Sequence, residues 1–136
     1  MEKVEHITRE AMKPLLQPYG LSEGVRVGTM LYLAGQTGLD AQHQIVPGGL
    51  KAQAIQTFRN IKALVELAGG RVDNLVHLTW YLADRPLARS FLEDATDVIA
   101  AKDEEMPGVK PGSTAVRVKE LLTPEILIEI QAVAAL

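Results

Sequence analysis

The stretch Leu75–Ala83 reads LVHLTWYLA, and it narrows the choice of fold more than any other part of the chain. It is rich in β-branched and aromatic residues, so it predicts a strand, which we extend by one residue to 74–83. Both alternating sets of side chains are largely uncharged: Val76, Leu78, Trp80 and Leu82 on one side, Leu75, Thr79, Tyr81 and Ala83 on the other. Strands of this kind are usually covered on both faces. The sequence therefore predicts a sheet that needs two covering layers.

Further strands are expected on both sides of this stretch. Short runs of β-forming residues predict strands at 25–27 and 30–34 around a turn at Gly28-Thr29, and one more near 5–8. Strands are also predicted at 114–118 and 126–134, joined across residues 122–124. Residues 14–20, 35–49 and 106–112 carry Pro and Gly, so they predict loops.

Two helices are expected between the strands. Residues 50–68 carry apolar side chains at steps of three and four, and Gly69-Gly70 is a suitable stop. A second helix is predicted to start at Asp84 with Pro86 in its first turn. Its expected buried stripe consists of Leu87, Phe91, Ala95, Val98 and Ile99.

This order of elements predicts an α+β fold in which two helices cover one face of the sheet. No predicted helix is left to cover the second face. Since that face also carries apolar residues, another copy of the chain is the expected cover, and a homo-oligomer is predicted.

Length and composition restrict the function. The chain has 136 residues, which predicts a single domain over residues 1–136. A net charge of -3 argues against nucleic acid or an anionic membrane as the main partner. No apolar run approaches the roughly 20 residues that span a bilayer, and the chain has no cysteine. A cytoplasmic location is the simplest expectation.

An ordered set of short motifs resembles the RidA (YjgF/YER057c/UK114) family over nearly the whole chain. The motifs are residues 24–28 (GVRVG), 33–38 (LAGQTG), 46–49 (VPGG), 52–54 (AQA), 60–63 (NIKA), 68–70 (AGG) and 127–134 (LIEIQAVA). The resemblance implies a chorismate-mutase-like fold with a mixed six-stranded sheet, and a homotrimer with ligand clefts between subunits. It also implies hydrolysis of imines or enamines to 2-oxo acids and ammonia, with no metal or organic cofactor.

Glu129 is the leading candidate for a catalytic residue. It interrupts an otherwise apolar strand, where desolvation would raise its pKa and suit it to proton transfer. Strand alternation places Glu129 and Gln131 on the same face. The alternative to a catalytic role is that both side chains simply face solvent from a half-exposed strand. The resemblance matches Glu129 to a site glutamate that positions or activates water. It also matches Gly35-Gln36, directly after a strand, to a turn that lines the cleft.

The sequence departs from the family at the substrate-binding arginine. Active deaminases of the family read Pro-x-Arg-Ser/Thr-x-Val where this chain has residues 111–116 (PGSTAV). Ser113, or Gly112 in another register, therefore stands in place of the arginine. In the family, the guanidinium of that arginine makes a bidentate contact with the substrate carboxylate. Thr114 and Ala115 complete this predicted binding strand. Arg117 lies four residues on, roughly 13 Å from Ser113, and is better interpreted as a surface or intersubunit arginine than as a replacement.

The sequence also departs from the family at a cleft tyrosine, and it lacks the patterns of a metal site or a serine triad. Leu21 stands where the family has a tyrosine, and the nearby Tyr19 is the candidate substitute. The histidines lack the spacing of a metal site, and no Ser has a His and an acid near it in the sequence.

Three functions remain open on this sequence. The first is an imine or enamine deaminase-like hydrolase that uses Glu129. The second is an arginine-less paralogue with another substrate, such as an aminomuconate-type compound. The third is a non-catalytic trimer that binds small ligands such as 2-imino or 2-oxo acids. Loss of turnover on replacement of Glu129 would exclude the third.

Overall fold

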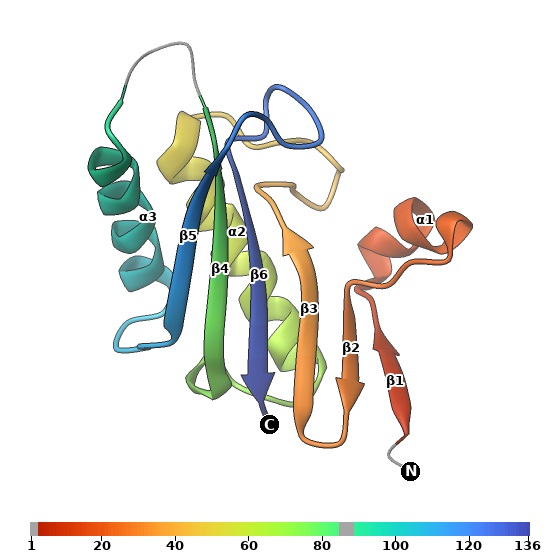
Figure 1. Cartoon of the computed structure of the whole chain (residues 1–136). Helices are drawn as coiled ribbons and strands as arrows, with labels where there is room; N and C mark the ends of the chain where they lie inside the picture. Colours follow the sequence, from red (N-terminus) through yellow and green to blue (C-terminus); the bar gives the residue numbers. More distant parts are fainter. Residues whose placement is uncertain (1–2, 85–88) are drawn as a thin grey trace.

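The computed structural model describes residues 3–84 and 89–136 and shows one mixed six-stranded sheet (Figure 1). The strand order is β1-β2-β3-β6-β4-β5. β4 and β5 run parallel, and all other neighbours run antiparallel. The expected α+β, chorismate-mutase-like fold is thereby confirmed. The strands are β1 (Val4–Ile7), β2 (Gly24–Val27), β3 (Met30–Gln36), β4 (Leu75–Ala83), β5 (Gly112–Val118) and β6 (Ile128–Ala135).

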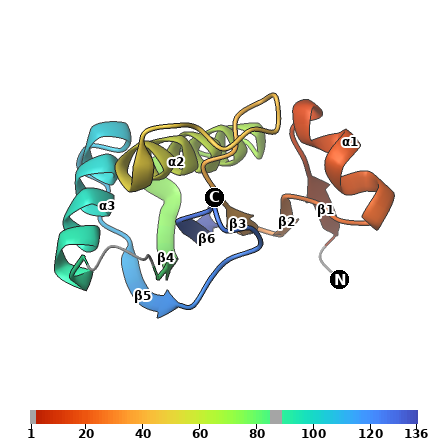
Figure 2. The ribbon, with the colours of Figure 1, turned by 90° about the horizontal axis from the view of Figure 1, so that it is seen from above.

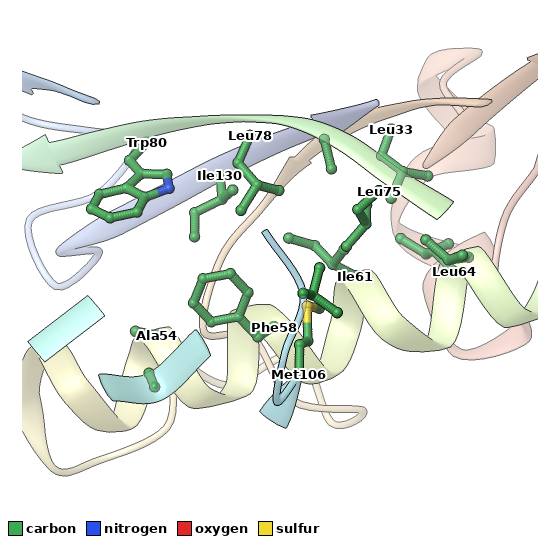
Figure 3. Close-up of a cluster of buried hydrophobic side chains, with 14 of the residues drawn as sticks. Leu33, Ala54, Phe58, Ile61, Leu64, Leu75, Leu78, Trp80, Met106 and Ile130 are labelled. Carbon is green, nitrogen blue, oxygen red and sulfur yellow. The ribbon is translucent and has the colours of Figure 1, made fainter. Parts of the chain in front are cut away.

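Two helices, α2 (Gly49–Leu67) and α3 (Phe91–Glu105), cover the same face of the sheet (Figure 2). α2 packs over β3 and β6, and α3 packs beside α2. Side chains from α2 and the strands interdigitate between these layers, with Phe58 and Ile61 facing Leu78 and Ile130 (Figure 3). All four are fully buried, and each such side chain contributes about 1.5–3 kcal/mol to stability. No described helix is long and apolar enough to cross a membrane.

α2 agrees with its predicted range to within one residue at each end. It stops at Ala68 because Gly69 takes a φ of 92°, a left-handed conformation that glycine adopts without strain. The N–H of Gly70 then donates to the carbonyl of Val65, which satisfies one of the last carbonyls of the helix.

The N-terminal connection is helical where a loop was predicted. α1 (Lys13–Leu16) is flanked by 3-10 turns at Glu10–Met12 and Gln17–Tyr19. The prolines that suggested a loop occupy the first turns of α1 and of the second 3-10 turn, where a missing N–H costs nothing. Figure 1 places α1 beside the ends of β1 and β2.

The predicted start of α3 at Asp84 is wrong. The helix begins at Phe91, with Ser90 as its N-cap accepting from the N–H of Glu93. Pro86 and Leu87 of the prediction lie outside the described residues. Of the predicted buried stripe, Val98 is fully buried and Ala95 partly so, whereas Phe91 and Ile99 are exposed. α3 turns Asp94 and Ala101 inward instead, because Asp94 is bound by Arg117 of β5.

Strand alternation holds in β6 and is broken in β4. Ile128, Ile130 and Ala132 face the helices, while Glu129 and Gln131 face away, as predicted. In β4 a bulge between Leu75 and His77 turns Val76 outward, so its predicted burial is wrong. β5 and β6 follow each other in the chain, but β4 lies between them in the sheet. The face of the sheet away from α2 and α3 exposes the apolar side chains of Tyr32 and Val116.

Candidate functional site

A cavity of about 460 Å³ opens where β3 ends and β6 begins. α1, the loop at residues 37–45 and the connection at residues 122–126 close it from the other sides. Four predicted site residues line this cavity together: Leu21, Gly35, Gln36 and Glu129. These four come from parts of the chain that lie up to 108 residues apart, so the fold assembles this half of the predicted site.

The carboxyl group of Glu129 lies directly over the backbone of Gly35. A Cβ atom at position 35 would lie 2.7 Å from Cδ and 2.8 Å from Oε2 of Glu129, which is too close for any side chain. β3 carries one extra residue here, because Leu33 pairs with Ala132 and Gln36 with Ile130. Such bulges redirect side chains and are common beside functional sites. Glycine is therefore required for this approach of Glu129 to the strand.

Burial raises the pKa of Glu129 above the ordinary value of a glutamate. The carboxyl group is half-buried, and desolvation disfavours its charged form. A carboxyl group with a raised pKa can both accept and donate a proton closer to neutral pH than an exposed glutamate can. This property fits the role that the sequence predicted for Glu129.

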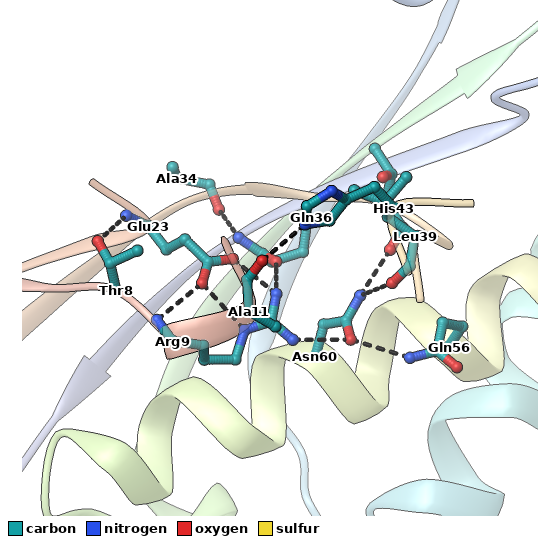
Figure 4. A network of polar contacts seen from close by, with 11 residues as sticks. Thr8, Arg9, Ala11, Glu23, Ala34, Gln36, Leu39, His43, Gln56 and Asn60 are labelled. Carbon is teal, nitrogen blue, oxygen red and sulfur yellow. Dashed lines mark hydrogen bonds and ion pairs between the residues drawn. The ribbon is translucent and has the colours of Figure 1, made fainter. Parts of the chain in front are cut away.

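A buried polar network forms the floor beside Gln36 (Figure 4). Arg9 donates from Nη2 to Oε2 of Glu23 at 2.6 Å and from Nε to Oε1 at 2.9 Å. Its Nη1 donates to Oδ1 of Asn60 at 2.9 Å, and its Nη2 also reaches Oε1 of Gln36 at 3.3 Å. Asn60 in turn donates to the carbonyls of Thr37 and Leu39. The network thus joins the N-terminal segment, the residue that precedes β2, β3 and α2 beside the cavity.

This network fixes the turn that the sequence singled out. The side chain of Gln36 is buried, donates to the carbonyl of Ala34 at 3.2 Å and accepts from Arg9. Gln36 therefore serves the framework with its side chain, and any ligand contact at this position falls to its backbone. His43 adds a second tie, because its Nε2 lies 2.6 Å from the carbonyl of Ala11 and holds the loop against the N-terminal turn.

The other predicted site residues lie outside the cavity of the chain. Ser113, Thr114 and Ala115 are on β5, which β4 separates from β6. At about 4.8 Å between neighbouring strands, β5 lies about 10 Å from Glu129. Tyr19 is 78% exposed and does not line the cavity either. Within one chain, the predicted site is therefore divided into two halves.

Arg117 is engaged inside the chain. Its Nη1 donates to Oδ2 of Asp94 at 2.7 Å, and its guanidinium lies 5.6 Å from the centre of the Phe91 ring. Asp94 is 1% exposed, so this ion pair is well shielded from water. These contacts join α3 to β5 and leave Arg117 unsuited to replace the missing arginine.

Sequence reasoning missed Arg9, Glu23 and Asn60. Nothing near each residue marks it, because the partners of Arg9 lie 14, 27 and 51 residues away. Within residues 3–84 and 89–136, no three His, Asp or Glu side chains gather where they could hold a metal ion.

Comparisons with known proteins agree with this architecture. The family model described as Endoribonuclease L-PSP matches residues 10–136. A RutC family protein of Pyrococcus abyssi is 34% identical over 135 residues, which are 98% of each chain. The 2-iminobutanoate/2-iminopropanoate deaminase of Escherichia coli K12 is 31% identical over 131 residues, or 94% of each chain.

A solved structure supports the fold independently. A Mycobacterium tuberculosis member of the YjgF/YER057c/UK114 family superposes with a TM-score of 0.78, covering 98% of this chain and all of its own, at 22% identity. At that identity the likeness bears on the fold alone. The family model and the curated relatives extend over almost the full length, and we conclude that the chain belongs to the RidA (YjgF/YER057c/UK114) family.

Proposed function

We propose that this protein hydrolyses small imines or enamines to carbonyl compounds and ammonia, with Glu129 as the proton-transferring residue. The observation that carries the proposal is the half-buried Glu129 carboxyl, which lies against the Gly35 backbone in the lining of the cavity. The relative from Escherichia coli named as an imine deaminase supports the same reaction class.

The chemistry requires one group that can move a proton in both directions. Glu129 accepts a proton from a water molecule as the oxygen of that water attacks the C=N carbon. The imine nitrogen takes up a proton and becomes an amino group. The protonated Glu129 then donates its proton to the amino nitrogen of the resulting carbinolamine. The C–N bond breaks and ammonia leaves as the hydroxyl group loses its proton and becomes the carbonyl. A carboxyl group with a raised pKa suits both steps, since each needs a different protonation state.

We further propose that the working site lies between copies of the chain in a homotrimer. Ser113, Thr114 and Ala115 of one copy would then face Glu129 and Gly35 of the next. Two observations support this arrangement: the division of the predicted site within one chain, and the apolar side chains on the uncovered sheet face. In family members with an arginine at position 113, this strand would supply the carboxylate anchor.

An assay with 2-aminoacrylate, generated by an amino-acid dehydratase, tests the reaction class. The protein should accelerate release of pyruvate over buffer, and Glu129→Gln should reduce the acceleration by about 10²-fold or more, the usual contribution of a general acid–base group. A Glu125→Gln variant, which alters another carboxylate that lines the cavity, serves as the matched control.

The same assay discriminates the non-catalytic alternative. If Glu129→Gln retains the full wild-type rate, the acceleration does not arise at this site and the catalytic proposal is wrong. The description of the family model names an endoribonuclease. The carboxyl groups that line the cavity would repel the phosphate backbone of RNA, so they do not favour that activity here.

A further inference from the structure

The cavity is lined largely by apolar side chains. They come from α1 and the residues on either side of it, from the loop at residues 37–45 and from the connection before β6. The larger ones are Met12, Leu15, Leu16, Leu21, Leu39, Ile45, Leu122 and Ile126. Ile126 is buried, whereas Leu15 and Leu21 are exposed at the opening. Exposed leucines around a cavity gain free energy when an apolar group covers them, at about 25 cal/mol per Å².

The charged residues around this cavity give it an acidic character. Among the described residues that line it, Arg9 has the only permanent positive charge and is offset by its ion pair with Glu23, so Glu125 and Glu129 are the remaining carboxyl groups. Arg9 is already engaged: Nε and Nη2 donate to Glu23, and Nη1 donates to Asn60. A bidentate clamp on a ligand carboxylate would require Arg9 to abandon a carboxylate that is 2% exposed.

An anionic ligand is therefore poorly matched to this half of the site. Its charge would be desolvated near the carboxyl groups of Glu125 and Glu129, with no free guanidinium on the described lining. An uncharged imine, or its protonated iminium form, meets no such penalty. Its nitrogen and carbon can face Glu129 while its substituent covers the leucines.

We propose that this protein acts preferentially on imines that carry an apolar substituent and no carboxylate, a class that oxidation of primary amines supplies. The inference rests on the proposed function and narrows its substrate. The reaction is R–CH=NH + H₂O → R–CHO + NH₃, which needs no oxidant or reductant beyond the enzyme that formed the imine.

Two imines that differ only by a carboxylate provide the test of turnover. An amine oxidase converts 2-phenylethylamine to its aldimine, and an L-amino-acid oxidase converts phenylalanine to the corresponding 2-imino acid. The loss of each imine is followed by trapping the remainder as its semicarbazone. We expect the protein to accelerate hydrolysis of the aldimine at least tenfold more than that of the imino acid. An equal or greater acceleration for the imino acid would overturn the inference.

A binding measurement separates this inference from the catalytic proposal. Phenylacetamide and phenylacetate have the same shape and differ in charge, and calorimetry gives the Kd of each. We expect phenylacetamide to bind at least tenfold more tightly. If neither imine is turned over but this preference holds, the catalytic proposal fails while the ligand class stands. If phenylacetate binds as tightly, or neither compound binds at millimolar concentration, the ligand class is wrong.

A charge placed at the cavity opening locates the binding site. Leu21→Arg supplies a guanidinium at a 58% exposed position, and Leu67→Arg is a control at a 54% exposed position on α2 that does not line the cavity. Leu21→Arg should shift the preference toward phenylacetate at least tenfold, and Leu67→Arg should leave it unchanged. An unchanged preference in Leu21→Arg would show that the ligand binds elsewhere and overturn the inference.

Discussion

At the scale of single residues, the contact between Gly35 and Glu129 controls the geometry of the cavity. Gly35→Ala would place a methyl group within 2.8 Å of the Glu129 carboxyl and force that side chain to move. Displacement of a reacting group by about 1 Å can reduce a rate 10²-fold. We therefore expect kcat/KM for imine hydrolysis to fall by about that factor in Gly35→Ala, with the folded structure retained by circular dichroism.

The control for this prediction is a double-mutant cycle, in which the effect of Gly35→Ala is measured in the wild type and in Glu129→Ala. In a Glu129→Ala background there is no carboxyl group to displace, so adding Gly35→Ala should cause little further loss. A loss of the same size in both backgrounds would mean that Gly35 acts independently of Glu129.

The raised pKa of Glu129 makes both activity and stability depend on pH. Activity that needs the ionised carboxyl group should fall as pH drops through this raised pKa, so the acid limb of kcat/KM should lie above the ordinary range of glutamate. The folded protein also holds this proton more tightly than the unfolded chain does. Its contribution to stability is therefore present at low pH and lost as pH rises from the ordinary to the raised pKa.

Urea unfolding between pH 4 and 8 measures this effect. Glu129→Gln removes the titrating group, so its free energy of unfolding should lack that part of the pH dependence. Identical pH profiles for the two proteins would contradict the raised pKa. Glu125→Gln, which changes an exposed carboxylate, should retain the wild-type profile.

The outward orientation of Glu129 and Gln131 was predictable because strand alternation is a local property. The raised pKa followed from the apolar neighbours in the sequence. The engagement of Arg117 was not predictable, since it depends on where α3 packs. Arg9 gave no signal at all, because a charged residue in an N-terminal segment usually faces solvent and its burial is decided by distant partners.

At the scale of secondary-structure elements, the start of α3 depends on a reciprocal cap. Ser90 accepts from the N–H of Glu93, and the Glu93 carboxylate accepts from the N–H of Ser90. The same contacts lower the pKa of Glu93. Loss of an N-cap costs about 1 kcal/mol, so Ser90→Ala should lower the free energy of unfolding by that amount in urea titrations at fixed protein concentration.

Another hydroxyl side chain, that of Thr96 within α3, provides the comparison. Thr96→Ala removes an exposed methyl group and a hydroxyl that donates to the carbonyl of Leu92, one turn back along the helix. Its effect on stability should stay within about 0.5 kcal/mol. If Thr96→Ala is as costly as Ser90→Ala, the loss is not specific to the cap.

The ion pair of Arg9 and Glu23 ties the N-terminal segment to the sheet. Arg9→Met would leave the nearly inaccessible Glu23 carboxylate without its partner, and breaking a buried pair in this way costs about 3–5 kcal/mol. We expect a decrease of that size in the free energy of unfolding. The double variant Arg9→Met/Glu23→Leu should be more stable than Arg9→Met, and the reverse order would argue against a buried charge as the cause.

The elements themselves were predictable where the pattern was long and regular. α2 was located from its apolar spacing and its glycine stop. The start of α3 was misplaced because Asp84-Pro86 suggested an earlier cap, although the Ser90-x-x-Glu93 pattern was present in the sequence. α1 and the 3-10 turn after it were missed since Pro14 and Pro18 were interpreted as loop residues, whereas each occupies the first turn of its own element.

At the scale of the whole molecule, the uncovered sheet face should be the interface of the proposed trimer. Val116 is 40% exposed on this face and pairs with Tyr81 of β4. The hydroxyl of Tyr81 donates a hydrogen bond to the side chain of Gln131. Val116→Glu places a charge on this face. We expect light scattering after gel filtration to show a trimer for the wild type and monomers for Val116→Glu, with hydrolysis lost together with assembly.

Leu67→Glu is the control, because Leu67 is similarly exposed but lies at the end of α2. It should assemble and react as the wild type does. A monomeric wild type, or an intact trimer in Val116→Glu, would contradict the proposed interface. The uncharged faces of β4 predicted a partner, which stays a prediction. The division of the site was not predictable, since the sequence does not give the order of strands.

The central position of β6 has a consequence for how the chain reaches its native state. β6 is the last of the six strands in chain order, yet it lies between β3 and β4. Before it docks, those two strands each present an unpaired edge, which is the type of surface that recruits other chains into aggregates. Because these pairings join segments far apart in the sequence, they also slow folding. We therefore expect the newly made protein to be most prone to aggregation in the interval before β6 inserts.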